Sequence, residues 1–320
     1  MEEQLMIYKD LGNTGVNVSI LGFGGLRLPS RGYGDNEVVD DEKAFPLIQK
    51  AADAGINFFD TGWGYVNEDS QRAIGAALKP YRDKVYFSNK LPLYLTYKPD
   101  DFWRYLDKEL SLMDTDHIDF YHFHMVGRKF WEEKILRFKL IDLAEKAKAK
   151  GLINHIGFSF HDVPELMKEM VDTEAFEVLI CQYNMVDQNN ENVMQYARDK
   201  GVGIIVMGPT AGGNISDGGN EFLKKFTHSP AKTATELAMR FVWANKNVDC
   251  ALSGVQDMDM LMENIHSAEK YNEITPEEFA YMKNTLNETL GISQLRDLKC
   301  TGCRYCDVCP KGIRPFVTIT

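Results

Sequence analysis

Four cysteine thiols near the end of this chain are the residues with the clearest potential for chemistry. Cys300, Cys303, Cys306 and Cys309 follow one another at intervals of three residues, and Pro310 comes directly after the last of them. Thiols spaced this closely seldom serve a hydrophobic core, whereas as thiolates all four could reach one metal centre. The segment therefore predicts a metal site.

The spacing of these thiols favours an iron–sulfur cluster over zinc. Bacterial ferredoxins use the run Cys-x2-Cys-x2-Cys-x3-Cys-Pro, from which this segment differs by one residue in the last gap. Zinc sites usually divide their ligands into two pairs that lie a dozen or more residues apart. A [4Fe-4S] cluster on these four cysteines is thus the first expectation, with zinc or simple thiols and disulfides as alternatives. Cys181 and Cys250 lie in predicted strands and are not expected to contribute.

A second set of polar residues stands at the ends of predicted strands. Each could merely cap a loop or face solvent, but together on one rim they would form a site. They are Asp60, Lys90, His124, Ser159 and Gln182.

Tyr65 adds a phenol to this set, five residues after Asp60 on a glycine-punctuated segment. Reduction of a carbonyl needs a hydride donor and a proton donor, and a tyrosine with an ordinary pKa of about 10 is a poor acid at neutral pH. A neighbouring ammonium stabilises the phenolate, and a carboxylate can hold that ammonium in place. Tyr65, Lys90 and Asp60 supply these parts, although Tyr65 could also be an ordinary loop aromatic.

The segments that must position these residues alternate regularly along the chain. Short apolar runs predict strands at residues 19–24, 57–60, 85–90, 118–124, 155–158, 178–182, 203–207 and 248–253. Amphipathic segments predict helices at residues 43–54, 69–78, 102–113, 132–150, 163–172, 191–200, 231–244 and 258–268, with a last helix from 276 to about 290. Eight strand–helix units predict an α/β chain folded as a (β/α)8 barrel, with a doubly wound open sheet as the alternative.

The predicted barrel has two additions. Residues 7–18 carry Gly12 and Gly15 between two short runs and predict a hairpin that closes the bottom of the barrel. We expect residues 1–290 to form the barrel domain and residues 291–320 to form the cysteine-bearing segment. The glycine-rich residues 203–219 predict a loop after the seventh strand.

The composition limits the partners and the compartment. With a net charge of −11, the surface repels phosphate backbones, so neither nucleic acid nor an anionic membrane is expected as a partner. The acidic start does not predict a signal peptide, and no apolar run reaches the roughly 18 residues of a membrane span. We therefore expect a cytoplasmic protein whose cysteines are reduced.

Several motifs resemble those of the aldo/keto reductases over nearly all of residues 5–290. Residues 8–15, 21–25 and 54–61 resemble the family's N-terminal signatures, residues 116–124 its fourth strand and residues 150–159 its fifth. The resemblance implies a (β/α)8 barrel that uses NAD(H) or NADP(H), with a catalytic tetrad at Asp60, Tyr65, Lys90 and His124. It selects His124 over His122, which we expect to be a hydrogen-bonded core residue. The cysteine segment is similar to that of an iron–sulfur-bearing bacterial and archaeal branch of the family.

The resemblance also implies roles and contacts. Tyr65 would donate the proton, Lys90 would tune it, Asp60 would hold Lys90 and His124 would orient the oxygen of a small carbonyl or alcohol. Trp63 and residues 125–131 would line the substrate pocket, and His161 could face cofactor or substrate. The implied cofactor contacts are Ser159, Gln182, Tyr183, Gly208, Pro209, Gly212, Gly254, Gln256 and Asn264.

Two departures from the family concern the cofactor. The loop after the seventh strand lacks the family's frequent basic residue, and residues 254–269 contain Asp257, Asp259 and Glu263 but neither Lys nor Arg. The usual partners of a 2′-phosphate are therefore missing, which favours NADH or dual use. Two rival functions remain open: electron transfer from the cluster to a flavin or a redox partner protein, and a non-enzymatic redox sensor.

Overall fold

Eight parallel strands close into a barrel in the computed structural model, which describes residues 6–217 and 223–289. The barrel strands are β3 (Leu21–Gly24), β6 (Phe58–Asp60), β7 (Tyr86–Leu91), β8 (Ile118–Val126), β9 (Ile153–Phe160), β10 (Val178–Gln182), β11 (Gly203–Met207) and β12 (Cys250–Ser253). Neighbours in the barrel follow chain order, and β12 closes onto β3. The predicted (β/α)8 barrel is confirmed, and the open-sheet alternative is wrong.

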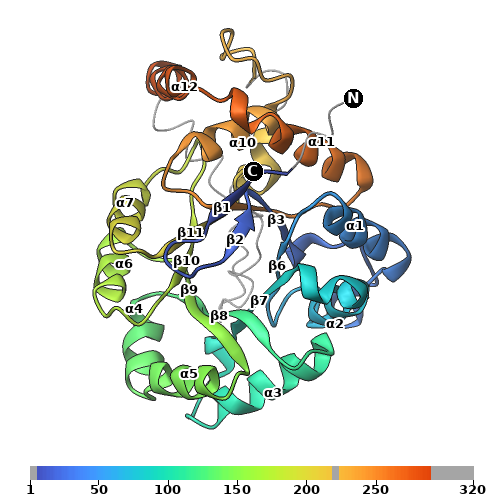
Figure 1. The fold of residues 1–320 in the computed structure, drawn as a ribbon, viewed down its shortest axis with the longest axis vertical. Helices are drawn as coiled ribbons and strands as arrows, with labels where there is room; N and C mark the ends of the chain where they lie inside the picture. The colour runs from blue at the N-terminus through green and yellow to red at the C-terminus, as the bar shows by residue number, and fades with distance from the viewer. Residues whose placement is uncertain (1–5, 218–222, 290–320) are drawn as a thin grey trace.

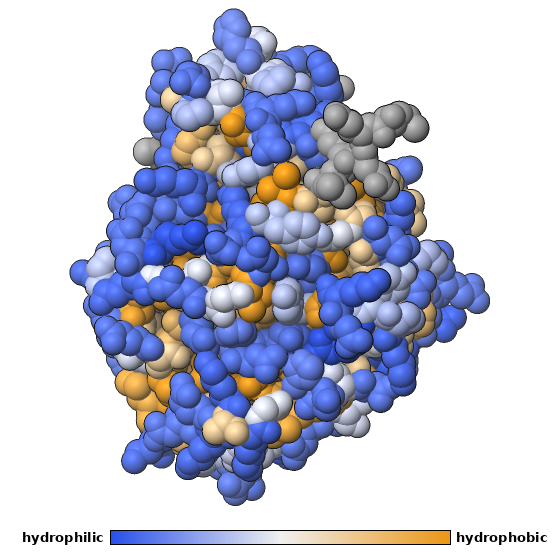
Figure 2. Space-filling model, in the orientation of Figure 1, coloured by the Kyte–Doolittle hydropathy of each residue, from blue (hydrophilic) through white to orange (hydrophobic). Residues whose placement is uncertain are grey.

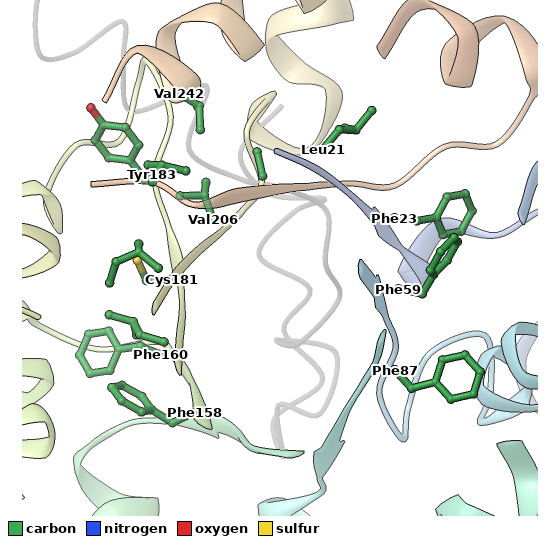
Figure 3. Close-up of a cluster of buried hydrophobic side chains, with 14 of the residues drawn as sticks. Leu21, Phe23, Phe59, Phe87, Phe158, Phe160, Cys181, Tyr183, Val206 and Val242 are labelled. Carbon is green, nitrogen blue, oxygen red and sulfur yellow. The ribbon is translucent and has the colours of Figure 1, made fainter. Parts of the chain in front are cut away.

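Helices surround the barrel on the outside (Figure 1). They are α1 (Asp41–Asp53), α2 (Asp69–Leu78), α3 (Asp101–Met113), α5 (Leu140–Ala149), α6 (Pro164–Val171), α7 (Glu191–Asp199), α10 (Ala234–Ala244) and α11 (Met258–Glu269), followed by α12 (Pro276–Thr289). Alternate strand residues pack between barrel and helices, and Figure 3 shows Phe23, Phe59 and Phe87 pointing outward from the strands into this layer. Within the described ranges, every helix is too short or too polar to cross a membrane.

The predicted hairpin is present and sits at the bottom of the barrel. β1 (Tyr8–Asp10) pairs antiparallel with β2 (Asn17–Ser19), and Leu11 and Val18 pack into the barrel interior. Gly12, at φ +53°, approaches the start of β11 so closely that an added Cβ would lie 2.3 Å from the Gly203 nitrogen. The face around the hairpin is largely hydrophilic (Figure 2).

One predicted helix is wrong. Residues 132–150 were expected to form a single helix, but a short α4 (Arg128–Phe130) runs into a π-helical turn, Trp131–Leu136, and α5 begins only at Leu140. Lys139, with φ +51°, separates the two parts. The apolar periodicity continues through this break without Gly or Pro, so the sequence contains no signal for it.

Candidate active site

A buried ion pair joins two neighbouring strand ends. Lys90 Nζ lies 2.7 Å and 2.6 Å from the two carboxylate oxygens of Asp60 and also donates to the Thr61 carbonyl. The Ser88 hydroxyl donates to Asp60 at 2.7 Å. Burial lowers the pKa of Lys90 and raises that of Asp60, and their attraction opposes both shifts. The side chains are only 2% and 4% exposed, so this arrangement is fixed by the barrel.

Two aromatic rings meet above this ion pair. Lys90 Nζ lies 4.9 Å from the centroid of the Tyr65 ring, and the rings of Tyr65 and His124 are 5.9 Å apart. An added Cβ at Gly62 would lie 3.2 Å from the Tyr65 ring and 3.4 Å from His124 Cε1, so the absence of a side chain there lets the rings converge. The structure thus brings the four predicted tetrad residues together.

His124 is held in its neutral form. Burial lowers its pKa well below the ordinary value, and the charge of Lys90 and the neighbouring His161 and His122 act in the same direction. A neutral imidazole can donate one hydrogen bond to a substrate oxygen without carrying charge. The site therefore offers a phenol and an imidazole side by side, with a buried ammonium next to the phenol.

Tyr94 is a second phenol at this site, and sequence reasoning missed it. It lies in the 3-10 turn Leu93–Leu95, with its ring 6.4 Å from that of His124 and its hydroxyl 3.0 Å from where a Cβ on Gly64 would stand. Burial, with help from Glu68, raises its pKa to about 12. The only sequence signal was its position shortly after Lys90.

A cleft of about 810 Å³ opens at these strand ends. Asp60 and Tyr65 line one part of it. Most of the residues predicted to bind cofactor line it as well: Gln182, Gly208, Pro209, Gly212, Gly254, Gln256 and Asn264.

Side-chain amides hold the cleft's loops in shape. Asn184 donates to the Gly208 carbonyl and Asn190 to the Gln182 carbonyl, each at 2.9 Å. Asn264 donates to the Ser253 hydroxyl at 2.9 Å, while its buried carbonyl oxygen has no hydrogen-bond partner among the described residues. An elongated polar ligand with its own donors fits such a surface, because it would satisfy this oxygen and meet the exposed backbone of the glycine-rich turn.

Two predicted cofactor contacts do not reach the cleft. Tyr183 is fully buried, and the centroid of its ring lies 5.8 Å from that of the stacked Phe241 ring. Figure 3 shows the Tyr183 side chain outside the barrel, near Val242 of α10. Ser159 is 1% exposed and accepts a hydrogen bond from the Met125 backbone at 2.9 Å. Tyr183 directly follows Gln182, and the alternation of strand residues turns it outward.

The residues predicted to line a substrate pocket do not line this cleft. Trp63 packs edge-on against Tyr105 at 4.7 Å and donates to Glu68, and it does not line the cleft. Residues 125–131 do not line it either, because Trp131 is 1% exposed and donates to Glu169 on α6. The cleft wall on this side comes from the last residue of β9, Phe160, and from the residues that follow it as far as Pro164.

His161 and His122, the two other histidines considered for the site, lie in different surroundings. His161 lines the cleft, and burial lowers its pKa to about 4. His122 is fully buried inside the barrel, where Gly157 leaves room for its ring. The expectation of a hydrogen-bonded core histidine is half right, since neither ring nitrogen of His122 has a partner among the described residues.

The charges of the cleft are unbalanced. Four acids line it, Asp60, Asp162, Asp187 and Glu263, whereas Arg27 is the only Lys or Arg among the described lining residues. Sequence reasoning missed Arg27. Within the described part of the chain no cluster of His, Cys, Asp and Glu could hold a metal ion, and Cys181 and Cys250 are buried free thiols. Cys300, Cys303, Cys306 and Cys309 lie outside the described residues.

Comparison with known proteins agrees with the barrel fold. The sequence pattern of the aldo/keto reductase family matches residues 20–287, and the chain therefore belongs to this family of NAD(P)-dependent oxidoreductases. L-galactose dehydrogenase of Arabidopsis thaliana is 26% identical over 279 residues, covering 80% of this chain and 86% of the plant protein. An uncharacterised oxidoreductase of Schizosaccharomyces pombe is 26% identical over 261 residues, covering 78% and 82% of the two chains.

Solved structures show the same fold. The holo form of an aldo-keto reductase from Bacillus halodurans superposes with a TM-score of 0.73 at 22% identity, covering 91% of this chain and 99% of that chain. At this level of identity the likeness describes the barrel alone.

Proposed function

We propose that the protein transfers hydride between a nicotinamide cofactor and a carbonyl or alcohol substrate at the Asp60, Tyr65, Lys90 and His124 site. The observation that carries this proposal is the meeting of Tyr65, His124 and the buried Lys90–Asp60 pair. Of these, Asp60 and Tyr65 line a cleft to which Gln182 and Asn264 also belong, and Lys90 and His124 lie buried behind them. A nicotinamide dinucleotide, when bound, supplies the hydride.

The side chains of the site then supply the proton, stabilise the resulting phenolate and orient the substrate oxygen. Tyr65 donates its phenolic proton to the substrate oxygen in the reducing direction, and the ammonium of Lys90 beside its ring stabilises the phenolate that is left. Asp60 fixes Lys90 through two hydrogen bonds. His124, neutral and buried, donates a hydrogen bond that orients the same oxygen.

The residues proposed to hold the cofactor are the ones that line the cleft. Gln182 and the turn Gly208, Pro209 and Gly212 form one side, and Gly254, Gln256 and Asn264 form another. Gly208, at φ +63°, sits against the Gln182 amide, and an added Cβ there would lie 2.8 Å from its oxygen.

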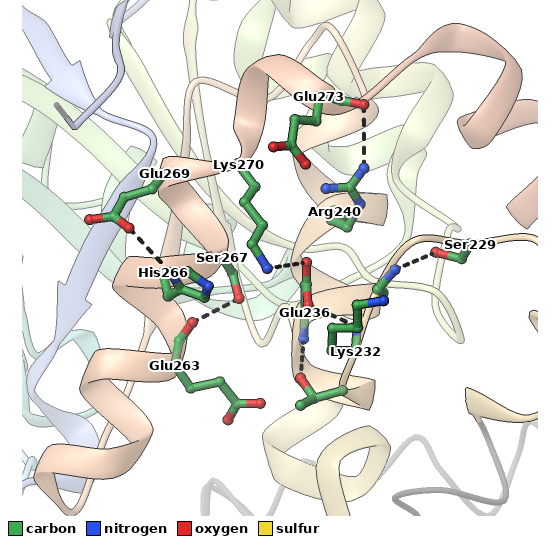
Figure 4. A network of polar contacts seen from close by, with 12 residues as sticks. Ser229, Lys232, Glu236, Arg240, Glu263, His266, Ser267, Glu269, Lys270 and Glu273 are labelled. Atoms are coloured by element: carbon green, nitrogen blue, oxygen red, sulfur yellow. Dashed lines mark hydrogen bonds and ion pairs between the residues drawn. The ribbon is translucent and has the colours of Figure 1, made fainter. Parts of the chain in front are cut away.

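The cleft supports use of NADH at least as well as NADPH. Glu263 is in the lining, whereas Asp257 caps α11 by accepting from the Met260 backbone at 2.8 Å. Lys270, the first cation after residues 254–269, points to Glu236 on α10 at 3.1 Å, and the Glu263 carboxylate points away from that network (Figure 4). Within the described part of the chain, a 2′-phosphate beside Glu263 would therefore meet an acid that no Lys of this helix offsets, at a cost on the order of 1 kcal/mol per like charge.

A matched pair of lysine variants tests the function. Lys90→Met removes the buried ammonium, and Lys79→Met removes an exposed one that pairs with Asp114. Reduction of a reactive dicarbonyl, followed by loss of reduced-nicotinamide absorbance and by product analysis, should fall roughly 10²- to 10³-fold in the first variant only. Thermal melting and cofactor titration show whether each variant is folded. Equal turnover in both variants, or no carbonyl or alcohol converted by wild type, would contradict the proposal.

We also propose that Cys300, Cys303, Cys306 and Cys309 hold a [4Fe-4S] cluster in the segment after the barrel. The spacing of the thiols and the following proline support it. The tetrad geometry favours a barrel that works as a reductase over a pure redox sensor, since a sensor needs no phenol beside a buried ammonium. Electron transfer to a flavin or to a redox partner protein, and location in the cytoplasm, stay predictions.

Metal analysis of protein purified without oxygen tests the cluster. About four iron and four sulfide per chain are expected, together with a brown colour. Replacing Cys303 by Ser should remove most of the iron, whereas replacing the buried Cys250 by Ser should not. Stoichiometric zinc in place of iron would rule the cluster out. A redox titration during turnover then distinguishes a cluster that passes electrons from one that only supports the fold.

A further inference from the structure

Arg27 is a positive side chain in a cleft whose described lining contains several acids. It ends the 3-10 turn Gly25–Arg27, directly after β3, and it is half-buried. Among the described residues that line the cleft there is no other Lys or Arg, while Asp60, Asp162, Asp187 and Glu263 are all there. The charge of Asp60 is already offset by Lys90. The three remaining carboxylates of the described lining therefore exceed the single guanidinium of Arg27 by two charges.

The stem of Arg27 is held in place by two neighbouring loops. An added Cβ at Gly254 would lie 3.3 to 3.5 Å from the Arg27 Cβ, Cγ and Cδ, so the stem packs across the backbone that follows β12. The Gly25 carbonyl accepts a hydrogen bond from Ser70 at 2.9 Å, and the Ser70 hydroxyl also contacts that of Thr61 at 2.9 Å. The turn is thus tied to the same rim that presents Asp60.

Strand order fixes where this guanidinium stands relative to the glycine-rich turn. β11, β12 and β3 are consecutive in the barrel. Gly208–Gly213 follows β11, Gly254–Gln256 follows β12 and Arg27 follows β3. Arg27 therefore flanks the β12 loop on the side opposite the glycine-rich turn, at the same end of the barrel.

We infer that Arg27 binds the diphosphate of the dinucleotide, an inference that rests on the proposed function. A diphosphate carries two negative charges, and in a cleft lined by acids it needs a cation. A guanidinium offers a fork of donors that matches two phosphate oxygens. Backbone amides of the glycine-rich turn and the side chain of Arg27 would then hold the diphosphate from two sides. The cleft would thus neutralise the part common to NADH and NADPH while offering nothing to the 2′-phosphate.

Fluorescence titration of the full-length protein with NADH, NADPH and ADP-ribose tests this inference. Arg27→Gln should weaken binding of all three roughly 10- to 100-fold, the size of a lost charge-assisted hydrogen bond, and should reduce the salt dependence of binding. The affinity of Arg27→Lys for each ligand should lie between those of wild type and Arg27→Gln. The matched control is Arg31→Gln, which removes an equal charge four residues away at an exposed position outside the cleft. Gly254→Ala, which presses on the Arg27 stem and keeps the charge, should weaken binding only a few-fold.

Steady-state kinetics separate the possible roles of Arg27. The inference expects a raised KM for NADH and a nearly unchanged kcat at saturating cofactor. Unchanged affinity for NADH and ADP-ribose in Arg27→Gln would overturn it, and a raised KM for an acidic substrate alone would instead assign Arg27 to substrate recognition. If wild type binds no dinucleotide, the proposed function itself fails. If Arg27→Gln does not fold, as judged by thermal melting, the Arg27→Lys and Gly254→Ala affinities decide, and wild-type values in both would overturn the inference.

Discussion

The two ends of the barrel differ in how completely their buried polar side chains are hydrogen-bonded. At the bottom, Asp119 accepts from the Phe87 backbone at 2.8 Å and pairs with Arg82 at 3.0 Å. Asp249 accepts from the Ile204 backbone at 2.9 Å and pairs with Arg198. At the rim, in contrast, the carbonyl oxygen of Asn264 is buried without a hydrogen-bond partner among the described groups.

The pKa shifts express the same difference. Burial would raise the pKa of Glu177 at the bottom, yet hydrogen bonds from His155, Lys148 and the Ile156 backbone lower it to about 2. At the rim, burial dominates and drives His124 and His161 toward their neutral forms. A buried polar group whose hydrogen bonds are all made within the protein is typical of a structural role. A polar group that lines a cleft and still has an unused donor or acceptor is typical of a binding site.

The largest expected effect is loss of the proton donor at the rim. Tyr65→Phe should lower kcat for reduction of a reactive dicarbonyl roughly 10²- to 10⁴-fold, because only the acid is removed. Cofactor affinity and thermal stability should hardly change. Tyr33→Phe, at a position 79% exposed, is the matched control and should behave like wild type. Wild-type turnover in Tyr65→Phe would mean that another group, with Tyr94 the first candidate, donates the proton.

The next largest effect is expected for Asp249 at the bottom of the barrel. It should lower the free energy of unfolding and leave kcat unchanged. Asp249→Asn keeps the shape of the side chain but removes the charge that Arg198 and the Ile204 backbone meet. We expect the free energy of unfolding to fall by about 1–3 kcal/mol in urea titration, with kcat per folded molecule unchanged. A large drop in kcat without a drop in stability would contradict the assignment of a structural role to the bottom and a catalytic role to the rim.

A single methyl group can test how tightly the rim is packed. Gly62→Ala places a carbon 3.2 Å from the Tyr65 ring, so Tyr65 must move by a few tenths of an ångström relative to His124. We expect kcat to fall about tenfold, which corresponds to about 1.4 kcal/mol, because misplacement of a catalytic group is costly. Gly64→Ala presses on the Tyr94 hydroxyl instead and should cost less. Equal losses in both variants would show that Tyr94 matters as much as Tyr65.

The sequence predicted the barrel, and the convergence of the four proposed tetrad residues, more completely than the lining of the cleft. Strand ends are legible because apolar runs stop at polar residues, which is how Asp60, Lys90, His124 and Gln182 were found. Burial along a strand is harder to predict, and Tyr183 turned out to face the helices. Arg27 and Tyr94 come from turns after β3 and β7, and their approach to the site depends on tertiary packing against Gly254 and Gly64. No local pattern in the sequence encodes that packing.

The smallest expected effect concerns His122, which resembles the rim in lacking partners but lies in the closed interior. Burial, then the charge of Lys90, lowers its pKa well below 6.5. The unfolded chain therefore binds a proton at this residue more readily than the folded protein, and stability falls as the pH drops below 6.5. At pH 6 this one histidine should cost about 0.8 kcal/mol relative to high pH.

Urea unfolding at pH 8 and pH 6 measures this cost. His122→Gln should shrink the difference in unfolding free energy between the two pH values by about 0.8 kcal/mol, whatever the variant does to stability at pH 8. Met262→Gln, at an exposed side chain on α11 that carries no titratable group, should leave the difference unchanged. An unchanged difference in His122→Gln would mean that folded His122 binds a proton as readily as the unfolded chain does, which requires groups around the ring that stabilise its charged form. His122 would then be grouped with the polar residues of the bottom, whose hydrogen bonds and ion pairs offset the cost of burial.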